Sequence, residues 1–343
     1  MKHLLNTLYI LSEDLYLSLD GENVVANRGG QAVARYPLHT LQSIVSFSYA
    51  GASPALMGAC AERQIGLCFC SPRGRFLARV SGGEAGNVLL RRTQYRIADD
   101  EPESCKISRA MIFGKLYNAR ASIARTARDH ALRVDGEQLD AACRQIGELL
   151  PQIQKTEAPD RLRGLEGVGS AAYFGVFDEL ILNPDEAFRF TGRSRRPPLD
   201  AVNALLSFSY SLLAHDCASA LEAAGLDPYV GFLHRDRPGR ASLALDLMEE
   251  LRPCLADRFV LTLLNNRMLK AADFLFMESG AVRLTDSGRK IFLQAWQERK
   301  KETLTHPYLG EKLPWGMVPY LQAMLLARQL RGDLDGYPPF LWK

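Results

Sequence analysis

Short runs of alternating apolar and polar residues fill the first part of the chain, and this period of two predicts β-strands. The predicted strands are Leu4–Leu11, Leu15–Leu19, Val24–Asn27, Ala32–Tyr36, Ser43–Tyr49, Gly66–Cys70 and Phe76–Val80. Asp20-Gly21, between the second and third runs, predicts a tight hairpin because glycine adopts the positive φ that such turns need. Ser53-Pro54 predicts the start of a helix over Ala55–Arg63. Together these elements predict a small, mostly antiparallel β domain with one helix.

Beyond residue 87 the apolar positions recur every three or four residues, which predicts helices. The expected helices are Asn87–Arg96, Ser108–His130, Asp140–Leu150, Ala158–Ile181, Ala201–Ala224, Ser242–Arg252, Ser287–Leu304 and Gly316–Leu330. Asp99–Glu103 is acidic and contains a proline, so it is expected to be a linker. The predicted fold class is therefore α+β, with a β-rich domain over residues 1–86, a connecting helix and linker over 87–104, and a larger all-α domain over 105–343.

A domain made mainly of short strands leaves unpaired strand edges, which folded proteins protect from uncontrolled pairing. Association with a second copy of the same chain is one way to cover such an edge. We therefore predict a homodimer formed through residues 1–86.

The composition is that of an ordinary folded protein, with 47% hydrophobic and 24% charged residues over 343 positions. The net charge of +3 permits a nucleic-acid partner without requiring one, so local clusters of arginine matter more than the total. The seven cysteines are scattered and lack a CxxC pair, which predicts reduced thiols in a cytoplasmic protein. The N-terminal MKHLLNTLYILSED is expected to be a first strand and not a signal peptide, and no apolar run is long enough to span a membrane.

The stretch Gly231–Pro253 combines a histidine, a basic turn and a short helix with several carboxylates. Ser242 is the expected N-cap of this helix, and Pro253 is expected to end it. On a helical period one face is apolar and packs in the core, whereas the opposite face is acidic. The residues of the acidic face are Asp246, Glu249 and Glu250.

A neutral imidazole beside carboxylates can bind a divalent cation, and His234 lies just before the turn that leads into this helix. The simpler interpretation is a solvated helix face with a histidine in the preceding loop. Four arginines favour the metal site, because basic side chains around metal ligands suit a phosphate substrate. These arginines are Arg235, Arg237, Arg240 and Arg252.

Glu166 lies in a second helix, beside the small residues Gly167–Ala172. A glycine inside a helix is destabilising by about 0.5–1 kcal/mol relative to alanine, so this patch predicts the close approach of another helix or of a sugar-phosphate chain. Three distant segments could then each supply one metal ligand. The candidate ligands are Glu166, His234 and either Glu249 or Asp246, and such an oxygen-and-imidazole set suits Mg²⁺ or Mn²⁺.

Four blocks of the sequence, taken in order, resemble one known family. They are RGLEGVGSAAYF, RRPPLDAVNALLSFSYSLL, GLDPYVGFLHRDRPGRASLALDLMEELRP and YPPFLWK. The chain resembles, over its whole length, the universal CRISPR-associated integrase of spacer acquisition, and most closely the subtype I-C form. The resemblance implies a β-rich N-terminal domain, an all-helical catalytic domain, a homodimer, and a complex with the small ferredoxin-like CRISPR adaptation partner.

The resemblance also implies a metal triad of Glu, His and an acidic residue, which fall on Glu166, His234 and Glu249. Asp246 and Glu250 remain alternatives for the third ligand because they share its helix. The implied reaction is attack by the 3′-hydroxyl of a short DNA duplex on a phosphodiester of the repeat array. With water as the nucleophile, the same site would cut DNA, including branched forms.

Double-stranded DNA as substrate gives the nearby basic residues a role in contacting phosphates, which position DNA without reading its sequence. Arg237 is the first candidate. The others are Arg163, Arg240, Arg252, Arg289 and Lys290.

Three other functions fit parts of the pattern. A metal-dependent nuclease of branched DNA in repair would use the same residues without integrating DNA. A non-catalytic DNA-binding scaffold would carry the carboxylates only as surface groups. A helical protein without a nucleic-acid partner would have its arginines dispersed over the surface.

Overall fold

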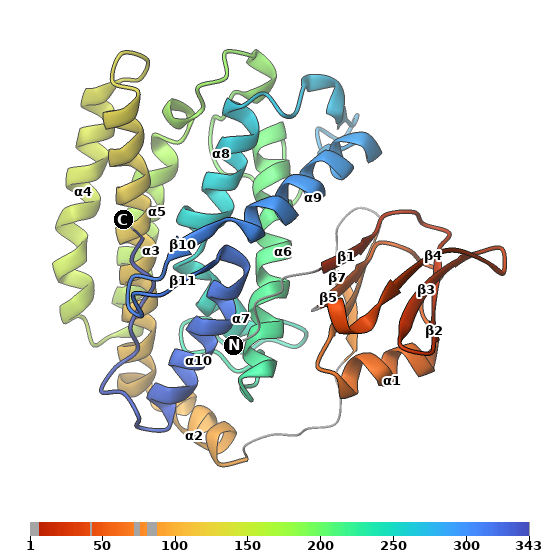
Figure 1. Ribbon diagram of the computed structural model, residues 1–343. Coiled ribbons are helices and arrows are strands. Elements are labelled where there is room, and N and C mark those ends of the chain that lie inside the picture. Colours follow the sequence, from red (N-terminus) through yellow and green to blue (C-terminus); the bar gives the residue numbers. More distant parts are fainter. Residues whose placement is uncertain (1–6, 42, 72–75, 81–87, 343) are drawn as a thin grey trace. The chain divides into compact units, whose positions relative to one another are not determined.

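The computed structural model describes residues 7–41, 43–71, 76–80 and 88–342, and its contacts divide the chain into two compact units, Met1–Gly86 and Asn87–Lys343 (Figure 1). The first unit contains strands and one α-helix, and the second is mainly helical. This agrees with the predicted α+β class. The first residues of the expected N-terminal strand lie outside the described residues, as does the segment Pro72–Gly74 between the expected strands Gly66–Cys70 and Phe76–Val80.

The first unit contains two sheets. β2 (Tyr16–Asp20), β3 (Asn23–Arg28) and β4 (Gln31–Pro37) form an antiparallel sheet, and Gly21 in the first hairpin has a φ of 57°, as the turn requires. The second sheet has the order β1-β5-β6-β7. Its strands are β1 (Thr7–Ile10), β5 (Ser43–Ser46), β6 (Gly66–Cys70) and β7 (Phe76–Val80).

The second sheet pairs β1 with β5 and β5 with β6 in parallel, and only β6 with β7 antiparallel. Parallel strands need a crossover connection, which α1 (Pro54–Glu62) supplies between β5 and β6. Ser53 caps this helix, accepting a hydrogen bond from the Leu56 N–H. The predicted helix is therefore confirmed, but alternation alone does not reveal the direction in which strands pair.

The two edges of the antiparallel sheet differ in how far they are covered. The edge strand β2 bonds to the segment before α1, because Leu17 N–H donates to Gly51 O and Ser53 N–H donates to Leu17 O. β4 pairs with β3 only, and most of its side chains are exposed, including Val33 and Tyr36. Among the described residues, β4 is thus the more accessible edge of this sheet.

The second unit is built around the long helix α3 (Glu101–Asp129), which packs against α4, α5, α7 and the π-helical segment η4. The other helices are α2 (Val88–Asp99), α4 (Gly136–Lys155), α5 (Pro159–Gly175), α6 (Ala201–Ala223), α7 (Ser242–Glu249), η4 (Arg252–Asp257), α8 (Arg258–Asn265), α9 (Asp286–Lys301) and α10 (Val318–Leu330). Two small hairpins accompany them: β8 (Phe274–Phe276) with β9 (Val282–Leu284), and β10 (Thr303–Thr305) with β11 (Lys312–Pro314).

The acidic stretch Asp99–Glu103 is not a linker. Asp100 accepts a hydrogen bond from the Glu103 N–H and caps α3, and the proline occupies the first turn, where its missing N–H costs nothing. The acidic side chains therefore stabilise the positive end of the helix dipole.

The prediction that Pro253 ends the helix of the central stretch is wrong. The chain continues through the π-helical turn η4, which includes Pro253, into α8. Such wide turns are rare and frequently mark functional sites. Ser242 is not the N-cap either, because its hydroxyl donates to Arg235 O in the preceding loop.

The acidic side of α7 is buried, which contradicts the simpler interpretation of a solvated helix face. Asp246 and Glu250 have no exposed surface, and Glu249 is 3% exposed. Helical periodicity separates two faces of a helix, but it does not tell which distant segments cover each face. Here the loop before the helix and a segment from the far end of the chain cover the acidic side.

The small-residue patch of α5 serves close helix packing. A Cβ at Gly169 would lie 2.4 Å from the Leu116 side chain of α3, whereas a Cβ at Gly167 would meet nothing within 4 Å. The helix also ends earlier than expected, at Gly175, and the chain then turns through the short 3₁₀ segment Asp178–Leu180. Of the two approaches that the patch predicts, the structure shows the neighbouring helix.

Candidate metal and DNA-binding site

Lys115, on α3, brings together two of the three predicted metal ligands. Its ammonium group contacts Glu166 of α5 and lies 2.7 Å from Glu249 Oε2 of α7. Ser170, one turn after Glu166, donates a hydrogen bond of 2.7 Å to the same Glu166 oxygen. Segments that lie far apart in the sequence thus place two carboxylates around one cationic group.

His234 is held by Asp246. Its Nδ1 lies 2.5 Å from Asp246 Oδ1, and an ionised carboxylate can only accept, so Nδ1 carries the proton. The lone pair of Nε2 is then free for a cation, as in metal sites where a carboxylate orients a histidine ligand. The backbone N–H groups of Phe232, Leu233 and His234 also donate to Asp246, at 2.6, 2.9 and 3.0 Å.

These bonds occupy both oxygens of Asp246, which makes it a poor alternative as the third metal ligand. Glu250 is unsuitable too, because its side chain points into a separate network with Gln322, Tyr337 and the Phe340 N–H. Burial raises the pKa of Glu250 to about 7, although these hydrogen bonds act in the opposite direction. Of the three acids on this part of the chain, only Glu249 faces Lys115.

Positive charge dominates the surroundings of Glu249. Burial by itself would raise the pKa of this carboxyl, but the charges of Arg252 and Lys115, with a further electrostatic effect of His234, lower it from 4.5 to about 2. Arg252 Nη2 lies 3.1 Å from Glu249 Oε1. Glu249 is therefore ionised at neutral pH, and His234 lies within electrostatic reach of it.

Next to these groups, two arginines flank the ring of Tyr210 from α6. The guanidinium carbons of Arg252 and Arg193 lie 4.8 and 5.3 Å from the centroid of this ring. The Tyr210 hydroxyl donates a hydrogen bond of 2.6 Å to Asp257 Oδ1. Burial raises the pKa of Asp257 to about 6, against the opposing effects of Tyr210, Arg252 and Arg193. Arg193 is fixed in turn by the side chain of Asn203, which is fully buried.

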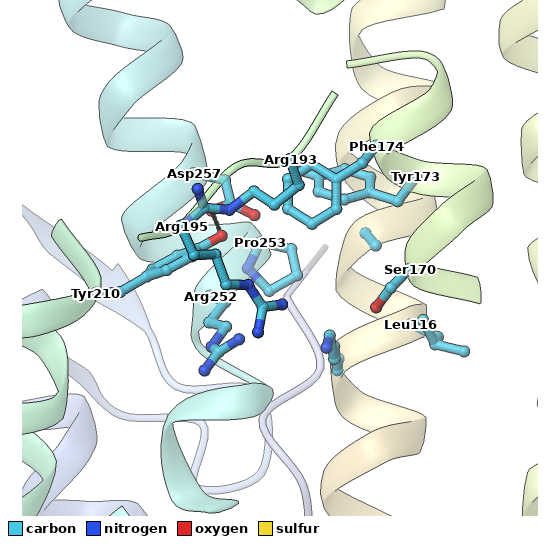
Figure 2. A pocket seen from close by; sticks show the side chains of 12 residues that line it. Leu116, Ser170, Tyr173, Phe174, Arg193, Arg195, Tyr210, Arg252, Pro253 and Asp257 are labelled. Carbon is cyan, nitrogen blue, oxygen red and sulfur yellow. Dashed lines mark hydrogen bonds between the residues drawn. The ribbon is translucent and has the colours of Figure 1, made fainter. Parts of the chain in front are cut away.

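A cleft opens beside this layer. An open hollow of about 380 Å³ lies between the last turns of α5 and the following loop, and its lining includes Ser170, Gly175, Thr191, Arg193 and Arg195. A narrower extension is lined by Lys115, Arg252 and Asp257 as well. Figure 2 shows Arg193, Arg195 and Arg252 gathered on one side, with Ser170 facing them from α5.

The arginines of this cleft have donor capacity to spare. Within the described part of the chain, the buried Nε–H groups of Arg193 and Arg252 donate to no hydrogen-bond acceptor. Arg195 is exposed at the mouth of the cleft. Unpaired guanidinium donors around a hollow suit an anion with several oxygen atoms, such as a phosphate group.

The predicted DNA-contacting residues differ in their placement. Arg252 lies at the site, where it pairs with Glu249. Arg163 links α5 to the loop that contains His234, because it donates a hydrogen bond of 3.5 Å to Leu233 O. Arg237 is exposed in the basic turn, and Arg240 is half-buried there. Arg289 pairs with Asp286 at the start of α9, and Lys290 is exposed beside it.

Lys115, Ser170, Arg193 and Arg195 are absent from the site predicted by sequence. A signal for Lys115 did exist, because it lies on the apolar stripe of α3 with Ile112, Leu116 and Ala119, all of which are buried. A lysine on such a stripe requires a buried partner. The arginines after α5 form an unmistakable basic loop, but only the fold shows that this loop borders the site.

The side chains around Lys115 decide whether this site can hold a divalent metal ion. Among the residues that the structure describes, no three His, Cys, Asp or Glu side chains stand close enough together to bind a metal ion. The two carboxylates are instead joined through the Lys115 ammonium. The donors nevertheless fit: two carboxylates already share a cation, Nε2 of the imidazole is available, and Glu249 Oε2 has an ion pair but no aligned hydrogen bond.

The fold and this cluster of acids, imidazole and arginines define a protein with the features of a nucleic-acid-processing enzyme. The model of the family "CRISPR associated protein Cas1" matches residues 8–298. A CRISPR-associated endonuclease Cas1 of Rhodospirillum rubrum is 54% identical, and one of Chlorobaculum tepidum is 48% identical, each over 100% of both chains. The chain belongs to the Cas1 family.

Solved structures support the same fold. A casposase bound to integration product matches with a TM-score of 0.82 at 21% identity, covering 100% of this chain and 95% of that one. The Cas1 protein of Thermotoga maritima matches with a TM-score of 0.80 at 22% identity, covering 95% and 97%. A chain of a Cas6-RT-Cas1–Cas2 complex matches with a TM-score of 0.81 at 22% identity, covering 100% of this chain and 36% of that one.

The endonuclease names of these relatives support a nuclease. No helix among the described residues is long and apolar enough to cross a membrane. The described cysteines are all free thiols.

Proposed function

We propose that this protein is a metal-dependent DNA integrase and endonuclease of CRISPR adaptation. It joins the 3′-hydroxyl ends of short DNA duplexes to the repeat array and also cuts DNA, including branched forms. The observation that carries this function is the pairing of Glu166 and Glu249 with Lys115, at the edge of an arginine-lined cleft and with His234 within electrostatic reach of Glu249. Family membership and the casposase neighbour support the same reaction class.

The reaction is a transesterification. A bond forms between the attacking 3′-oxygen and phosphorus while the bond to the leaving 3′-oxygen breaks, and a proton passes from the attacking hydroxyl to the leaving oxygen through solvent or a protein base. Mg²⁺ or Mn²⁺, held by Glu166, His234 Nε2 and Glu249, would polarise the phosphoryl group. Asp246 keeps the imidazole in the tautomer with Nε2 free.

The arginines act on the phosphate. Arg193 and Arg252 are held in place by Tyr210 and Asn203, so their guanidinium groups are arranged before DNA binds. Donors fixed in advance stabilise the extra negative charge of the transition state without rearranging. Arg195 and the exposed Arg237 are further phosphate contacts, and such contacts accept DNA of any sequence.

The assembly is also part of the proposal. A homodimer formed through the first unit, and a complex with the small ferredoxin-like adaptation partner, would present two such sites to one duplex. The Cas6-RT-Cas1–Cas2 neighbour supports an adaptation partner. The free thiols of the described cysteines fit the cytoplasm, where the DNA array resides. The relation to subtype I-C remains a prediction.

A plasmid-joining assay tests this function. The protein and its adaptation partner are mixed with Mn²⁺, a repeat-bearing supercoiled plasmid and a labelled duplex with 3′-hydroxyl ends. We expect half-site joined products, and none from a duplex with 3′-deoxy ends. Glu166→Ala, His234→Ala and Glu249→Ala should each abolish joining, while Glu148→Ala, an exposed glutamate of α4, should not. Cutting of branched DNA without joining would favour the repair nuclease, and DNA binding that all three variants retain, without joining or cutting by the wild type, would favour the scaffold.

A further inference from the structure

Residues 337–342, beyond the last helix, run through the interior beside the candidate site. Tyr337 is 6% exposed and Phe340 is fully buried. Phe340 packs against His306 and Trp315. The guanidinium carbons of Arg125 and Arg258 each lie 5.3 Å from the centroid of the Trp342 ring. We call residues 337–342 the terminal strap.

Glu250 binds the strap to the end of α7. Its carboxylate accepts hydrogen bonds from the Tyr337 hydroxyl, from the Phe340 N–H at 2.9 Å, and from Gln322 of α10 at 2.8 Å. The side chain has no exposed surface, so solvent cannot replace these bonds. Three donors from two distant segments therefore fix one residue next to the metal-ligand candidate Glu249.

Asn118 binds the same strap to α3. Its amide N–H₂ group donates hydrogen bonds of 2.7 Å to Glu250 O and 2.8 Å to Phe340 O. Its amide oxygen accepts a hydrogen bond of 2.8 Å from the Trp342 N–H. Asn118 is also fully buried. One side chain thus connects three elements: α3, the end of α7 and the strap.

The two connections lie directly behind the site. Lys115 precedes Asn118 by three residues, about one turn of α3. Glu249 precedes Glu250 by one residue, and the two side chains point to different surroundings, Glu249 to Lys115 and Glu250 to the strap. A Cβ at Gly114 would lie 3.0 Å from Glu250 Cβ and 3.1 Å from Pro339 Cβ, so these segments approach closely.

From this arrangement we infer that Glu250 and Asn118 are positioning residues, which use the terminal strap to fix the spacing between Glu249 on α7 and Lys115 on α3. The strap supplies no group to the reaction. Its effect arises because a carboxylate that binds a metal must be held to a fraction of an ångström, and a helix end without this support would tilt or fray.

Two conservative substitutions test this role in the full chain. Tyr337→Phe removes the hydroxyl that donates to Glu250 and that accepts a hydrogen bond of 2.7 Å from Gln322, and it keeps the ring. Glu250→Gln keeps the shape of the side chain but replaces one accepting oxygen with an N–H₂ group, which faces the donors that Glu250 now accepts from. Tyr320→Phe is the matched control, because this tyrosine of α10 is 38% exposed.

The first measurement is hydrogen–deuterium exchange of the free protein, which needs no activity. We expect exchange in residues 246–250 and 112–118 to accelerate about tenfold in both variants, with little change in α4. The second measurement is cleavage of a branched duplex with Mn²⁺, where kcat should fall about tenfold and KM for DNA should stay within about twofold.

The results separate this inference from the proposed function, on which its catalytic part rests. If the wild-type protein shows no metal-dependent cleavage, the proposed function fails, while the exchange data still support or overturn the strap. Faster exchange spread evenly over the helical unit, or a lower Tm with unchanged kcat and unchanged local exchange, would show that the strap is only a packing element and overturn the inference.

Discussion

Lys115 joins two of the candidate metal ligands. It is 8% exposed and compensates Glu166 and the buried Glu249. Removing one partner from a buried ion pair leaves an uncompensated charge, which is typically destabilising by about 3–5 kcal/mol. The sequence predicts the two acids. The position of Lys115 on the apolar stripe of α3 indicates a buried partner, but no local pattern shows that the partners come from α5 and α7.

We therefore expect Lys115→Met to lower the free energy of unfolding by about 3 kcal/mol in the absence of metal. Mn²⁺ should recover part of this loss, because a divalent ion can take the place of the ammonium group. Urea unfolding with and without Mn²⁺ measures both effects. The control is Lys106→Met, whose exposed ion pair with Glu103 on the same helix should contribute less than about 1 kcal/mol. Equal effects of the two substitutions would contradict the central role of Lys115.

Asp257 makes the free energy of unfolding depend on pH, and its raised pKa fixes the direction of this dependence. Its pKa is about 6 in the folded protein and 3.8 in a model peptide, because burial outweighs the opposing effects of Tyr210, Arg252, Arg193 and Tyr173. The folded state therefore binds more protons than the unfolded state between pH 4 and 6, and this contribution to stability is lost as the pH rises through that range.

Asp257→Asn should remove this dependence, since an amide does not titrate. The free energy of unfolding of the wild type, relative to the variant, should decrease by about 3 kcal/mol between pH 4 and pH 7. Urea unfolding at four pH values in this range gives the difference curve directly. A flat or rising difference curve would mean that Asp257 is ionised throughout the range.

At the scale of elements, the sequence predicts helices well and their surroundings poorly. The period of α7 separates its apolar face correctly, since Leu247 and Met248 are buried, but its acidic face is buried too. Contacts with residues 232–234 and with the terminal strap cover that face, and these contacts join positions up to 90 residues apart. Only the tertiary structure brings such segments together.

The packing of α5 on α3 can be measured with two glycines. Gly167→Ala should stabilise the protein by about 0.5–1 kcal/mol, because the helix gains propensity and the added methyl meets no atom within 4 Å. Gly169→Ala should destabilise it, because the added methyl would lie 2.4 Å from the Leu116 side chain. Thermal unfolding of both variants gives the comparison. A stabilising Gly169→Ala would show that Leu116 moves aside freely.

At the scale of the whole molecule, the first unit has its own hydrophobic core and leaves β4 open at one edge. Short alternating runs predict both the strands and the need to cover an edge. They do not predict which edge is free, because the partner of β2 is the irregular segment around Gly51.

If the proposed homodimer forms through this edge, the substitution Val33→Glu in β4 should give a monomer in light scattering of the full chain. A charge in the middle of an apolar strand edge opposes pairing with a second copy. Val88→Glu, on the exposed start of α2, is the matched control and should leave the dimer intact. A monomeric wild type would disprove the homodimer, and a dimeric Val33→Glu would place the interface elsewhere.

The wide π-helical turn between α7 and α8 sets the direction in which the side chains of α8 point around the helix axis. Each residue of an α-helix advances the side chains by about 100° around the axis, so trimming this turn by one residue to an ordinary pitch would swing Asp257 away from Tyr210. Chain length across residues 252–257 should consequently tolerate less change than the identity of most individual side chains there. Single-residue deletions in this segment would therefore be more harmful to DNA processing than conservative substitutions at the same positions.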